Sequence, residues 1–366
     1  MMLVERKRIF APPLLLLAVL LGAVAPLVRA EAEPSADFRP RIGLVLSGGG
    51  ARGGAHIGVL RVLEEQRVPV DYIAGTSMGS IIGGLYSVGY APDDMARIVG
   101  DIDWDAAFRD DPVRKRLSFR RKEDDDLPLW PIEIGIGGHG PSGPAGLTTA
   151  SRIEFIFRNL TLDAVGIRDF DDLPIPYRAV AADLDSGDPV VLGSGELAMA
   201  MRASMSIPAV FTPVELDGRL LVDGGIAMNL PVEVAQAMGA DVIIAIDVGT
   251  PTRHASERLT ATGVYSQTFS VLAKENVARS LERFGGDDLL IVPDLSEVKT
   301  GEFDNIDEAI ASGEAAARAV VDELRRFAVS EEEYARFLAR QRRDSRESDQ
   351  FMIDEVVVES VTRTRT

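Results

Sequence analysis

The sequence predicts a three-layer α/β fold, in which helices cover both faces of a mainly parallel sheet. Two units of strand, glycine-rich turn and helix follow one another near its start. The apolar run 42–46 leads through a glycine cluster into a helix-spaced stretch at 51–66, and the run 70–74 leads through a second glycine turn into an apolar helix at 80–88. Strands joined by helices in this way lie parallel in one sheet.

Two hairpins and further helix and strand patterns complete the predicted domain. The segment 177–192 is a hairpin that turns at 185–188, and the segment 214–222 is a hairpin that turns at Asp217-Gly218. A capping box of Ser330 and Glu333 opens a last helix. The other expected elements are helices at 197–205, 232–238, 257–284 and 304–327, and strands at 242–247 and 289–292.

Composition excludes several classes of function. The chain has 366 residues, of which 39 are Lys or Arg and 57 are Asp or Glu, giving a net charge of −18. This acidic balance argues against binding of nucleic acid, because the phosphate backbone would be repelled. Without cysteine there is no disulfide framework, thiolate zinc site or cysteine nucleophile. Only three histidines could serve as bases: His56, His139 and His254.

Both ends of the chain carry segments that we expect to lie outside the catalytic domain. Residues 1–30 combine a basic start, an apolar core and small residues before the expected cleavage point, which is typical of a signal peptide. We therefore expect export to the periplasm, the outer membrane or the cell surface. A linker at 31–40, a domain at 41–328 and a helical extension at 329–350 follow. Residues 351–366 contain an alternating strand that predicts the start of a further module.

A nucleophile elbow is predicted between the second strand and its helix. Gly75-Thr76-Ser77-Met78-Gly79 has the Gly-x-Ser-x-Gly pattern in the strand–turn–helix setting that this motif requires. The turn is so tight that the flanking positions lack side chains, and it lifts the serine hydroxyl out at the end of the strand. The helix that follows directs its positive end at that hydroxyl.

A second glycine loop lies at the same edge of the predicted sheet. Gly48-Gly49-Gly50-Ala51-Arg52-Gly53 allows successive backbone N–H groups to converge on an anion. The loop also matches G-x-G-x-x-G, but a dinucleotide site needs an acidic residue where the second strand ends, and Ala74-Gly75 stands there. The sequence therefore favours an oxyanion hole that faces the elbow.

Two residues compete for the role of base beside Ser77. Asp223, in Asp223-Gly224-Gly225 at the exit of a hairpin strand, could accept the proton directly if burial and neighbours orient it. His254 would complete a Ser77, Asp223 and His254 triad in α/β-hydrolase order. His56 lies on the apolar stripe of a helix, which predicts a core position, and His139 lies in a glycine stretch. The spacing of the residues in the sequence does not decide between Asp223 and His254 as the base.

The three motifs together resemble those of patatin-like phospholipases. The likeness covers residues 41–325 and includes the connecting blocks 51–60, 203–211 and 229–232. It implies a catalytic dyad of Ser77 as nucleophile and Asp223 as base, with an oxyanion hole formed by the N–H groups around Gly49, Gly50 and Ala51. It also implies phospholipid or lysophospholipid substrates at a membrane surface, without metal or cofactor. The tail resembles the first strand of the polypeptide-transport-associated domain that, in some exported members, precedes an outer-membrane β-barrel.

Two other functions remain open from the sequence. The triad would make the chain an ordinary esterase, and an exported lipid-binding module could retain the scaffold without catalysis. Near the predicted site, the glycine-rich segment 135–146 is either a lid or a surface loop. The basic run 114–122 is followed by acidic residues 123–126 that cancel much of its field.

Overall fold

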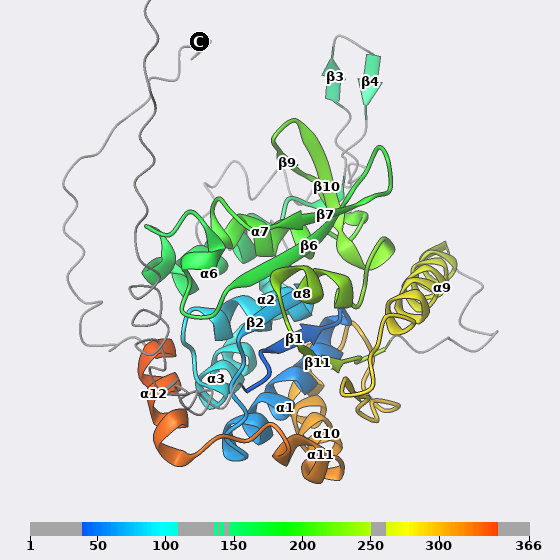
Figure 1. The fold of residues 1–366 in the computed structure, drawn as a ribbon. Coiled ribbons are helices and arrows are strands. Elements are labelled where there is room, and N and C mark those ends of the chain that lie inside the picture. The colour runs from blue at the N-terminus through cyan, green and yellow to red at the C-terminus, as the bar shows by residue number, and fades with distance from the viewer. Residues whose placement is uncertain (1–38, 109–134, 138–139, 143–145, 250–260, 343–366) are drawn as a thin grey trace, which may run out of the picture. The chain divides into compact units, whose positions relative to one another are not determined.

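The central sheet has the predicted mainly parallel character. The computed structural model describes residues 39–108, 135–137, 140–142, 146–249 and 261–342. Within these residues an eight-stranded sheet runs β12-β11-β1-β2-β6-β10-β9, with β7 also paired to β6 (Figure 1). Strands β12, β11, β1, β2 and β6 are mutually parallel, and β7, β9 and β10 are antiparallel to their neighbours.

The strands of this sheet are short, and those at its centre are buried. Their bounds are β1 Ile42–Leu46, β2 Tyr72–Thr76, β6 Tyr177–Asp183, β7 Pro189–Leu192, β9 Val214–Leu216, β10 Arg219–Asp223, β11 Val242–Ile246 and β12 Leu289–Ile291. Two further pairs lie outside it: β3 Gly135–Gly137 with β4 Gly140–Ser142, and β5 Gly146–Thr148 with β8 Ala209–Phe211. All residues of β1 and β11 are buried, as expected for parallel strands covered on both faces.

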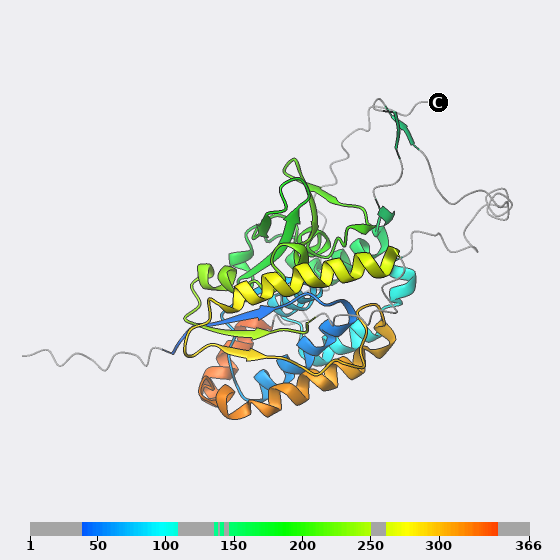
Figure 2. The ribbon, with the colours of Figure 1, turned by 90° about the vertical axis from the view of Figure 1, so that its right-hand side faces the viewer.

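Helices cover both faces of the sheet and confirm the three layers. The α-helices are α1 Gly54–Glu65, α2 Met78–Ser87, α3 Pro92–Asp101, α4 Trp104–Ala107, α6 Ser151–Leu160, α7 Leu197–Ser204, α8 Val232–Met238, α9 Ala261–Leu281, α10 Ile306–Ala319, α11 Val321–Arg325 and α12 Glu331–Gln341. Leu44 and Leu46 of β1 pack with α1, α2 and α10, whereas Val45 packs with α8 and α9. Figure 2 shows α9 on one side of the strands, with α1 and α10 on the other.

Strand β6 brings two distant segments together along one edge. Ala181 pairs with Val190 of β7 and with Asp223 of β10, while Val180 pairs with Val191 of β7 and with Thr76 of β2. A strand has only two edges, so β2 and β10 lie end to end on the edge opposite β7. The carboxyl ends of β2 and β10 therefore meet, one approaching from each direction.

Three helices were not expected from the sequence, and one expected helix is divided. Helix α3 begins with Pro92 and two acidic residues, which are ordinary helix-start signals. Helices α4 and α6 flank residues 109–134, which lie outside the described part. The helix predicted at 304–327 is broken at Val320, where φ is −115°. The β-branched pair Val320-Val321 at this point has lower helix propensity than the alanines before it.

The described elements belong to one compact unit that begins at Pro40, so α12 is part of the domain body. The predicted capping box is present, because Ser330 and Glu333 bond reciprocally at the start of α12. Glu64 of α1 pairs with Arg342, and Gln341 donates to the Tyr86 carbonyl. The predicted signal peptide, most of the linker and the terminal strand lie outside the described residues.

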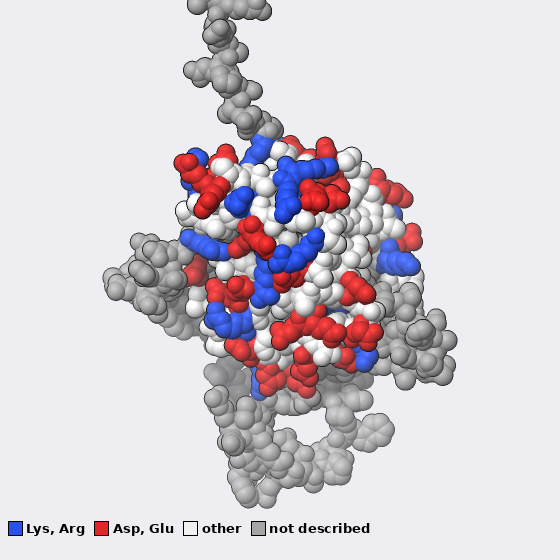
Figure 3. Space-filling model, turned by 90° about the horizontal axis from the view of Figure 1, so that it is seen from below, with Lys and Arg blue, Asp and Glu red and all other residues white. Residues whose placement is uncertain are grey.

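Acidic side chains on one face of the molecule are largely paired. The view from below, over the ends of α1, α10 and α11, shows acidic and basic side chains intermixed (Figure 3). Arg318 bridges Glu65 and Glu314, and Arg325 pairs with Asp322. Basic and acidic side chains alternate in the upper part of this view, and acidic side chains predominate in its lower part (Figure 3). Of the helices in the described part, none is long and apolar enough to cross a membrane.

Helices α1 and α10 approach each other closely through two glycines. A Cβ atom at Gly58 would lie 2.0 Å from the Ile310 carbonyl oxygen, and one at Gly313 would lie 2.0 Å from the Ala55 carbonyl oxygen. Backbone cannot yield as a flexible side chain can, so both positions require glycine. The contact holds α1, which follows directly on the glycine loop.

We expect Gly58→Ala to lower the free energy of unfolding by about 2 kcal/mol or more, because the added methyl group forces the two helices apart. The matched control is Gly100→Ala in α3, where no atom lies within 4 Å of an added Cβ. There the substitution should be stabilising by about 0.5–1 kcal/mol through lost unfolded-state entropy. Urea unfolding of both variants is the measurement, and equal stability of the two would contradict the packing described.

Candidate active site

Ser77 occupies a strained turn between β2 and α2. Its backbone has φ 52° and ψ −122°, a conformation that residues with a side chain rarely adopt. The flanking glycines make the turn possible, because a Cβ at Gly75 would lie 2.4 Å from the Gly79 carbonyl oxygen and one at Gly79 would lie 2.3 Å from the Leu46 carbonyl oxygen. Thr76 ties the turn down by donating to the Met228 carbonyl at 2.8 Å. The strand–turn–helix context of the predicted elbow is therefore present.

Ser77 and Asp223 are in direct contact. The Ser77 hydroxyl donates to Oδ2 of Asp223 at 2.7 Å, although 146 positions separate the two residues in the chain. Their side chains meet because β2 ends at Thr76 and β10 ends at Asp223 on the same edge of β6. Asp223 is 1% exposed and Ser77 is 8% exposed.

Burial gives Asp223 the acid–base properties that a catalytic carboxylate needs. Removal from water raises the pKa of Asp223 to about 6, and hydrogen bonds from the Gly225 N–H and the Ser77 hydroxyl oppose this rise. The Gly225 N–H donates to Oδ1 at 2.8 Å, so a backbone group orients the carboxylate while Oδ2 faces the serine. At neutral pH the group is ionised but much more basic than an exposed aspartate.

Two serines, Ser204 at the end of α7 and Ser206 just after it, hold the pair in place. The Ser77 N–H donates to Oγ of Ser204 at 2.9 Å, and this hydroxyl donates in turn to the Val180 carbonyl at 2.5 Å. The Asp223 N–H donates to the Ser206 carbonyl at 2.8 Å. The same short segment therefore fixes the backbone of both residues.

Two buried asparagines support the opposite side. Asn276 of α9 accepts from the Asn229 N–H at 2.7 Å and donates to the Gly225 carbonyl at 2.9 Å. Asn229 in turn donates to the Gly48 carbonyl at 3.4 Å, and the Gly48 N–H donates to the Asn229 carbonyl at 3.3 Å. This chain of bonds joins the segment after Asp223 to the glycine loop.

The glycine loop lies against Ser77, but fewer of its N–H groups are available than predicted. A Cβ at Gly48 would lie 3.0 Å from the Ser77 Cβ. The prediction that the Ala51 N–H holds an oxyanion needs correction, because this group donates to the Thr300 carbonyl at 2.9 Å. Within the described residues, the N–H groups of Gly49, Gly50 and Met78 have no hydrogen-bond acceptor. These three N–H groups, two in the loop and one at the start of α2, are the remaining candidates for an oxyanion hole beside Ser77.

Arg52 and Gly53 of the predicted oxyanion motif serve to anchor the loop. The Arg52 guanidinium is buried and donates to the carbonyls of Val248, Leu295 and Val298 at 2.8–3.1 Å. It is therefore committed to the backbone beyond β11 and β12 and does not present its charge to an anion. A Cβ at Gly53 would lie 2.2 Å from Cγ of Met78, so the loop packs directly on α2.

The three histidines have different positions. His56 is fully buried, as expected, and its Nε2 lies 2.8 Å from the Ser47 carbonyl beneath the glycine loop. Burial lowers the pKa of His56 to about 4, which keeps the ring neutral. His139 and His254 lie outside the described residues. No group of three or more His, Asp or Glu side chains in the described part of the chain could hold a metal ion.

Ser77 and Asp223, which the sequence predicts as nucleophile and base, are in contact, but the sequence does not predict the residues that support them. Ser204 and Ser206 belong to a block noted only for its resemblance to a family, and neither Asn229 nor Asn276 was given a role. Their hydrogen bonds link residues that are far apart in the chain, and a single sequence has no local pattern that encodes them. Gly224 has a simpler role, because a Cβ there would lie 2.2 Å from the Val180 carbonyl oxygen.

Comparison with known proteins finds a family that this chain matches. The model of a family described as patatin-like phospholipase matches residues 44–236, which include both glycine motifs and Asp223. An uncharacterised NTE-family protein of Mycobacterium tuberculosis is 35% identical over 249 residues, which are 66% of this chain and 60% of that protein. Lysophospholipase NTE1 of Saccharomyces cerevisiae is 34% identical over 209 residues, 57% of this chain and 11% of that protein. The chain thus spans three fifths or less of these relatives.

Two solved structures are more distantly similar. VipD from Legionella pneumophila matches with a TM-score of 0.44 and 13% identity, over 78% of this chain and 67% of that one. ExoU from Pseudomonas aeruginosa, solved with SpcU, matches with a TM-score of 0.39 and 16% identity, over 80% of this chain and 53% of that one.

The raised pKa of Asp223 predicts that this residue costs stability at neutral pH. The folded state favours the protonated form of Asp223. The stability that this preference contributes is fully present below pH 4 and is lost as the pH rises through about 6. Asp223→Asn should therefore raise the free energy of unfolding at pH 8, by up to about 3 kcal/mol for a rise of about two pKa units. The gain should shrink towards zero at pH 4, as measured by urea unfolding at each pH.

Asp241→Asn is the control of opposite sign. Its side-chain hydrogen bond from Arg41 lowers the pKa of Asp241 to about 2, so this substitution should reduce stability above pH 4. A loss of stability in Asp223→Asn at pH 8 would contradict the desolvation described.

Proposed function

Because the chain belongs to the patatin-like phospholipase family, we propose that it hydrolyses the carboxylic esters of lipids, with phospholipids or lysophospholipids as substrates. The observation that carries this proposal is the 2.7 Å hydrogen bond from the Ser77 hydroxyl to a buried carboxylate. A serine with a desolvated base at this distance is the arrangement that nucleophilic acyl transfer requires. The lysophospholipase relative supports the choice of substrate class.

In the proposed first step, Asp223 takes the Ser77 proton as Oγ attacks the ester carbonyl. The carbonyl oxygen becomes an oxyanion, which the N–H groups of Gly49, Gly50 and Met78 stabilise at the N-terminus of α2. The Ser77 N–H does not take part, because Ser204 already accepts it. Collapse of the intermediate breaks the ester bond, the leaving alcohol takes the proton from Asp223, and the acyl group remains on Ser77.

In the proposed second step, water replaces the alcohol and Asp223 acts again as base. It takes a proton from the water as the oxygen attacks the acyl-enzyme carbonyl, and the same N–H groups stabilise the second oxyanion. The proton then returns to Oγ of Ser77 and the fatty acid leaves. Over the two proposed steps, ester and water are converted into alcohol and fatty acid, and no step requires a metal or cofactor.

The geometry favours the dyad over a triad through His254. In a triad an imidazole ring stands between the serine and the carboxylate, and a separation of 2.7 Å between Oγ and Oδ2 leaves no space for a ring. Both carboxylate oxygens already accept hydrogen bonds, one from Ser77 and one from Gly225. His254 is therefore left without a role in the proposed reaction.

Export and membrane contact rest on the sequence alone. We propose that the signal peptide at residues 1–30 directs the chain to the periplasm, the outer membrane or the cell surface, where its substrate is a membrane lipid. With a net charge of −18, attraction to an anionic bilayer has to be local. A following transport-associated module remains an expectation for residues 351–366.

We expect Ser77→Ala to abolish release of fatty acid, because the acyl-enzyme cannot form. Asp223→Asn should lower kcat by at least about 10³-fold, since the remaining binding and oxyanion groups supply only part of the rate. Product analysis by mass spectrometry, with a phospholipid that carries different chains at its two positions, is the measurement. His254→Ala is the control and should retain activity.

The outcomes separate the alternatives. If His254→Ala is inactive as Ser77→Ala is, the triad is correct and the dyad is wrong. If the wild-type chain binds liposomes but a serine-directed phosphonate does not label Ser77, the chain is a binding module and the proposed hydrolysis is wrong.

The pH dependence should follow the ionisation of Asp223. A base with a pKa of about 6 is mostly protonated at pH 5, so kcat/KM there should be about tenfold below its plateau above pH 7. The measurement is the pH profile with an ester substrate, with circular dichroism at each pH to verify the fold. A rate that is flat from pH 5 to pH 8 would show that Asp223 does not act with a raised pKa.

A further inference from the structure

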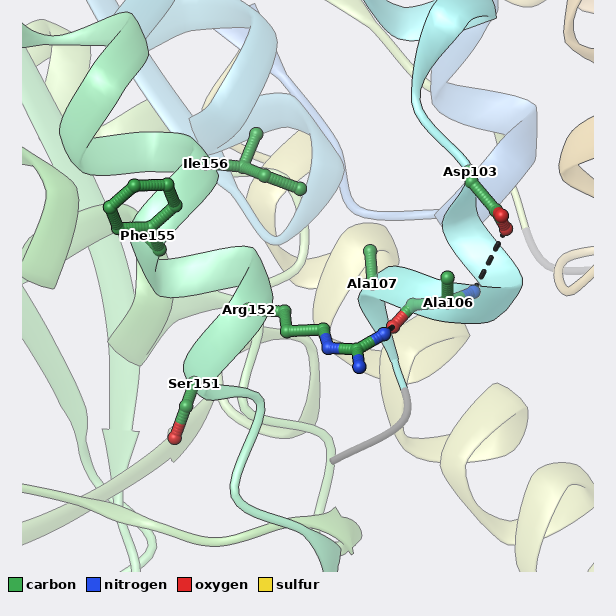
Figure 4. A pocket seen from close by; sticks show the side chains of 7 residues that line it. All are labelled: Asp103, Ala106, Ala107, Ser151, Arg152, Phe155 and Ile156. Carbon is green, nitrogen blue, oxygen red and sulfur yellow. Dashed lines mark hydrogen bonds between the residues drawn. The ribbon is translucent and has the colours of Figure 1, made fainter. Parts of the chain in front are cut away.

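A groove of about 440 Å³ lies between α4 and α6 (Figure 4). We propose that it holds the acyl chain of the ester, which rests on the hydrolysis proposed above. Seven residues line it: Asp103, Ala106, Ala107, Ser151, Arg152, Phe155 and Ile156. Its volume is within the range of sites that enclose small ligands.

The polar side chains that line the groove make hydrogen bonds to backbone groups or to a neighbouring hydroxyl. Asp103 caps α4 by accepting from the Ala106 N–H at 2.9 Å, and Arg152 donates to the Ala106 carbonyl at 3.1 Å. Ser151 pairs with the Thr149 hydroxyl at 2.7 Å. The surface that remains is carbon, from the alanines of α4 and from Phe155 and Ile156 of α6. An alkyl chain is the ligand that gains from such walls.

One end of the groove is joined to the glycine loop through aromatic rings. Phe108 follows Ala107, and its ring lies 5.4 Å from that of Phe303. Trp104 of α4 stacks on the same Phe303 ring at 4.3 Å. Phe303 stands three residues after Thr300, whose carbonyl accepts the Ala51 N–H. The helix that walls the groove is therefore packed against the segment that holds the proposed oxyanion donors.

The same ring of Phe108 also joins the groove to the support of Asp223. It lies 5.4 Å from the ring of Phe211, over which the Arg202 guanidinium packs at 5.4 Å. Arg202 donates to the Thr149 carbonyl, just before α6, and to the Ser206 hydroxyl. The Ser206 carbonyl accepts the Asp223 N–H. The walls of the groove are thus linked by packing and hydrogen bonds to both halves of the proposed active site, which supports its assignment to the acyl chain.

The rim of the groove is apolar as well. Phe155 is 66% exposed, whereas the other apolar residues of α6 are buried or partly buried. An exposed phenylalanine beside an apolar groove gains free energy when a chain covers it. This is the surface expected at the mouth of a site that receives lipid from a membrane.

The test fills the groove and measures selectivity for chain length. Ala106 is half-buried on α4, so Ala106→Phe places a ring in the groove with little change to the core. The substrates are p-nitrophenyl palmitate and p-nitrophenyl butyrate. We expect the palmitate-to-butyrate ratio of kcat/KM to fall about tenfold or more, because excluding two or more methylenes loses that much binding. Phe155→Asp, at an exposed position that does not perturb folding, should lower the ratio in the same direction.

The matched control is Ala335→Phe, the same substitution on the exposed face of α12, and it should leave the ratio unchanged. An unchanged ratio in folded Ala106→Phe and in Phe155→Asp overturns the proposal. An equal loss on both substrates also overturns it, because the groove would then receive another part of the substrate.

A binding measurement separates this proposal from the proposed hydrolysis. In a Ser77→Ala background, a fluorescent long-chain fatty acid should bind, and Ala106→Phe should weaken its binding about tenfold. Binding that is lost in this way supports the groove even if the wild-type chain releases no fatty acid. Hydrolysis with an unchanged ratio and unchanged binding would retain the enzyme and reject the groove.

Discussion

The rest of the site depends on two strands meeting end to end on one edge of β6. Thr76 and Asp223 pair with the successive residues Val180 and Ala181, so the residue after one strand faces the last residue of the other. This register sets the separation of Ser77 and Asp223 through backbone hydrogen bonds, which are stiffer than side-chain contacts. A shift of β10 by one residue would turn Asp223 to the other face of the sheet, away from the serine.

Bringing a carboxylate into this buried position is unfavourable, and the surrounding residues offset the cost locally. Desolvation raises the pKa of Asp223, while the Gly225 N–H and the Ser77 hydroxyl stabilise the ionised form. The strained turn at Ser77 is held from outside by the Ser204 hydroxyl.

The sequence could predict local features of this site but not the long-range contacts. The elbow, the glycine loop and the Asp-Gly-Gly turn have steric or capping requirements that are visible in a few adjacent residues, and the repeated strand–turn–helix units indicated the parallel sheet. The Ala51 N–H donates to the Thr300 carbonyl, and the Arg52 guanidinium donates to carbonyls beyond β11 and β12. Both contacts join segments that lie far apart in the chain, so only the folded structure reveals them. The direct contact of Ser77 with Asp223 likewise depends on the β6 register, which no local pattern encodes.

The same geometry supports the proposal that Asp223, and not one of the three histidines, is the base for Ser77. In a triad, a histidine takes the proton and an aspartate orients the histidine. Here the Gly225 N–H orients the carboxylate, and burial supplies the basicity that an exposed aspartate lacks. In the proposed dyad, backbone and environment thereby provide both functions that the imidazole has in a triad.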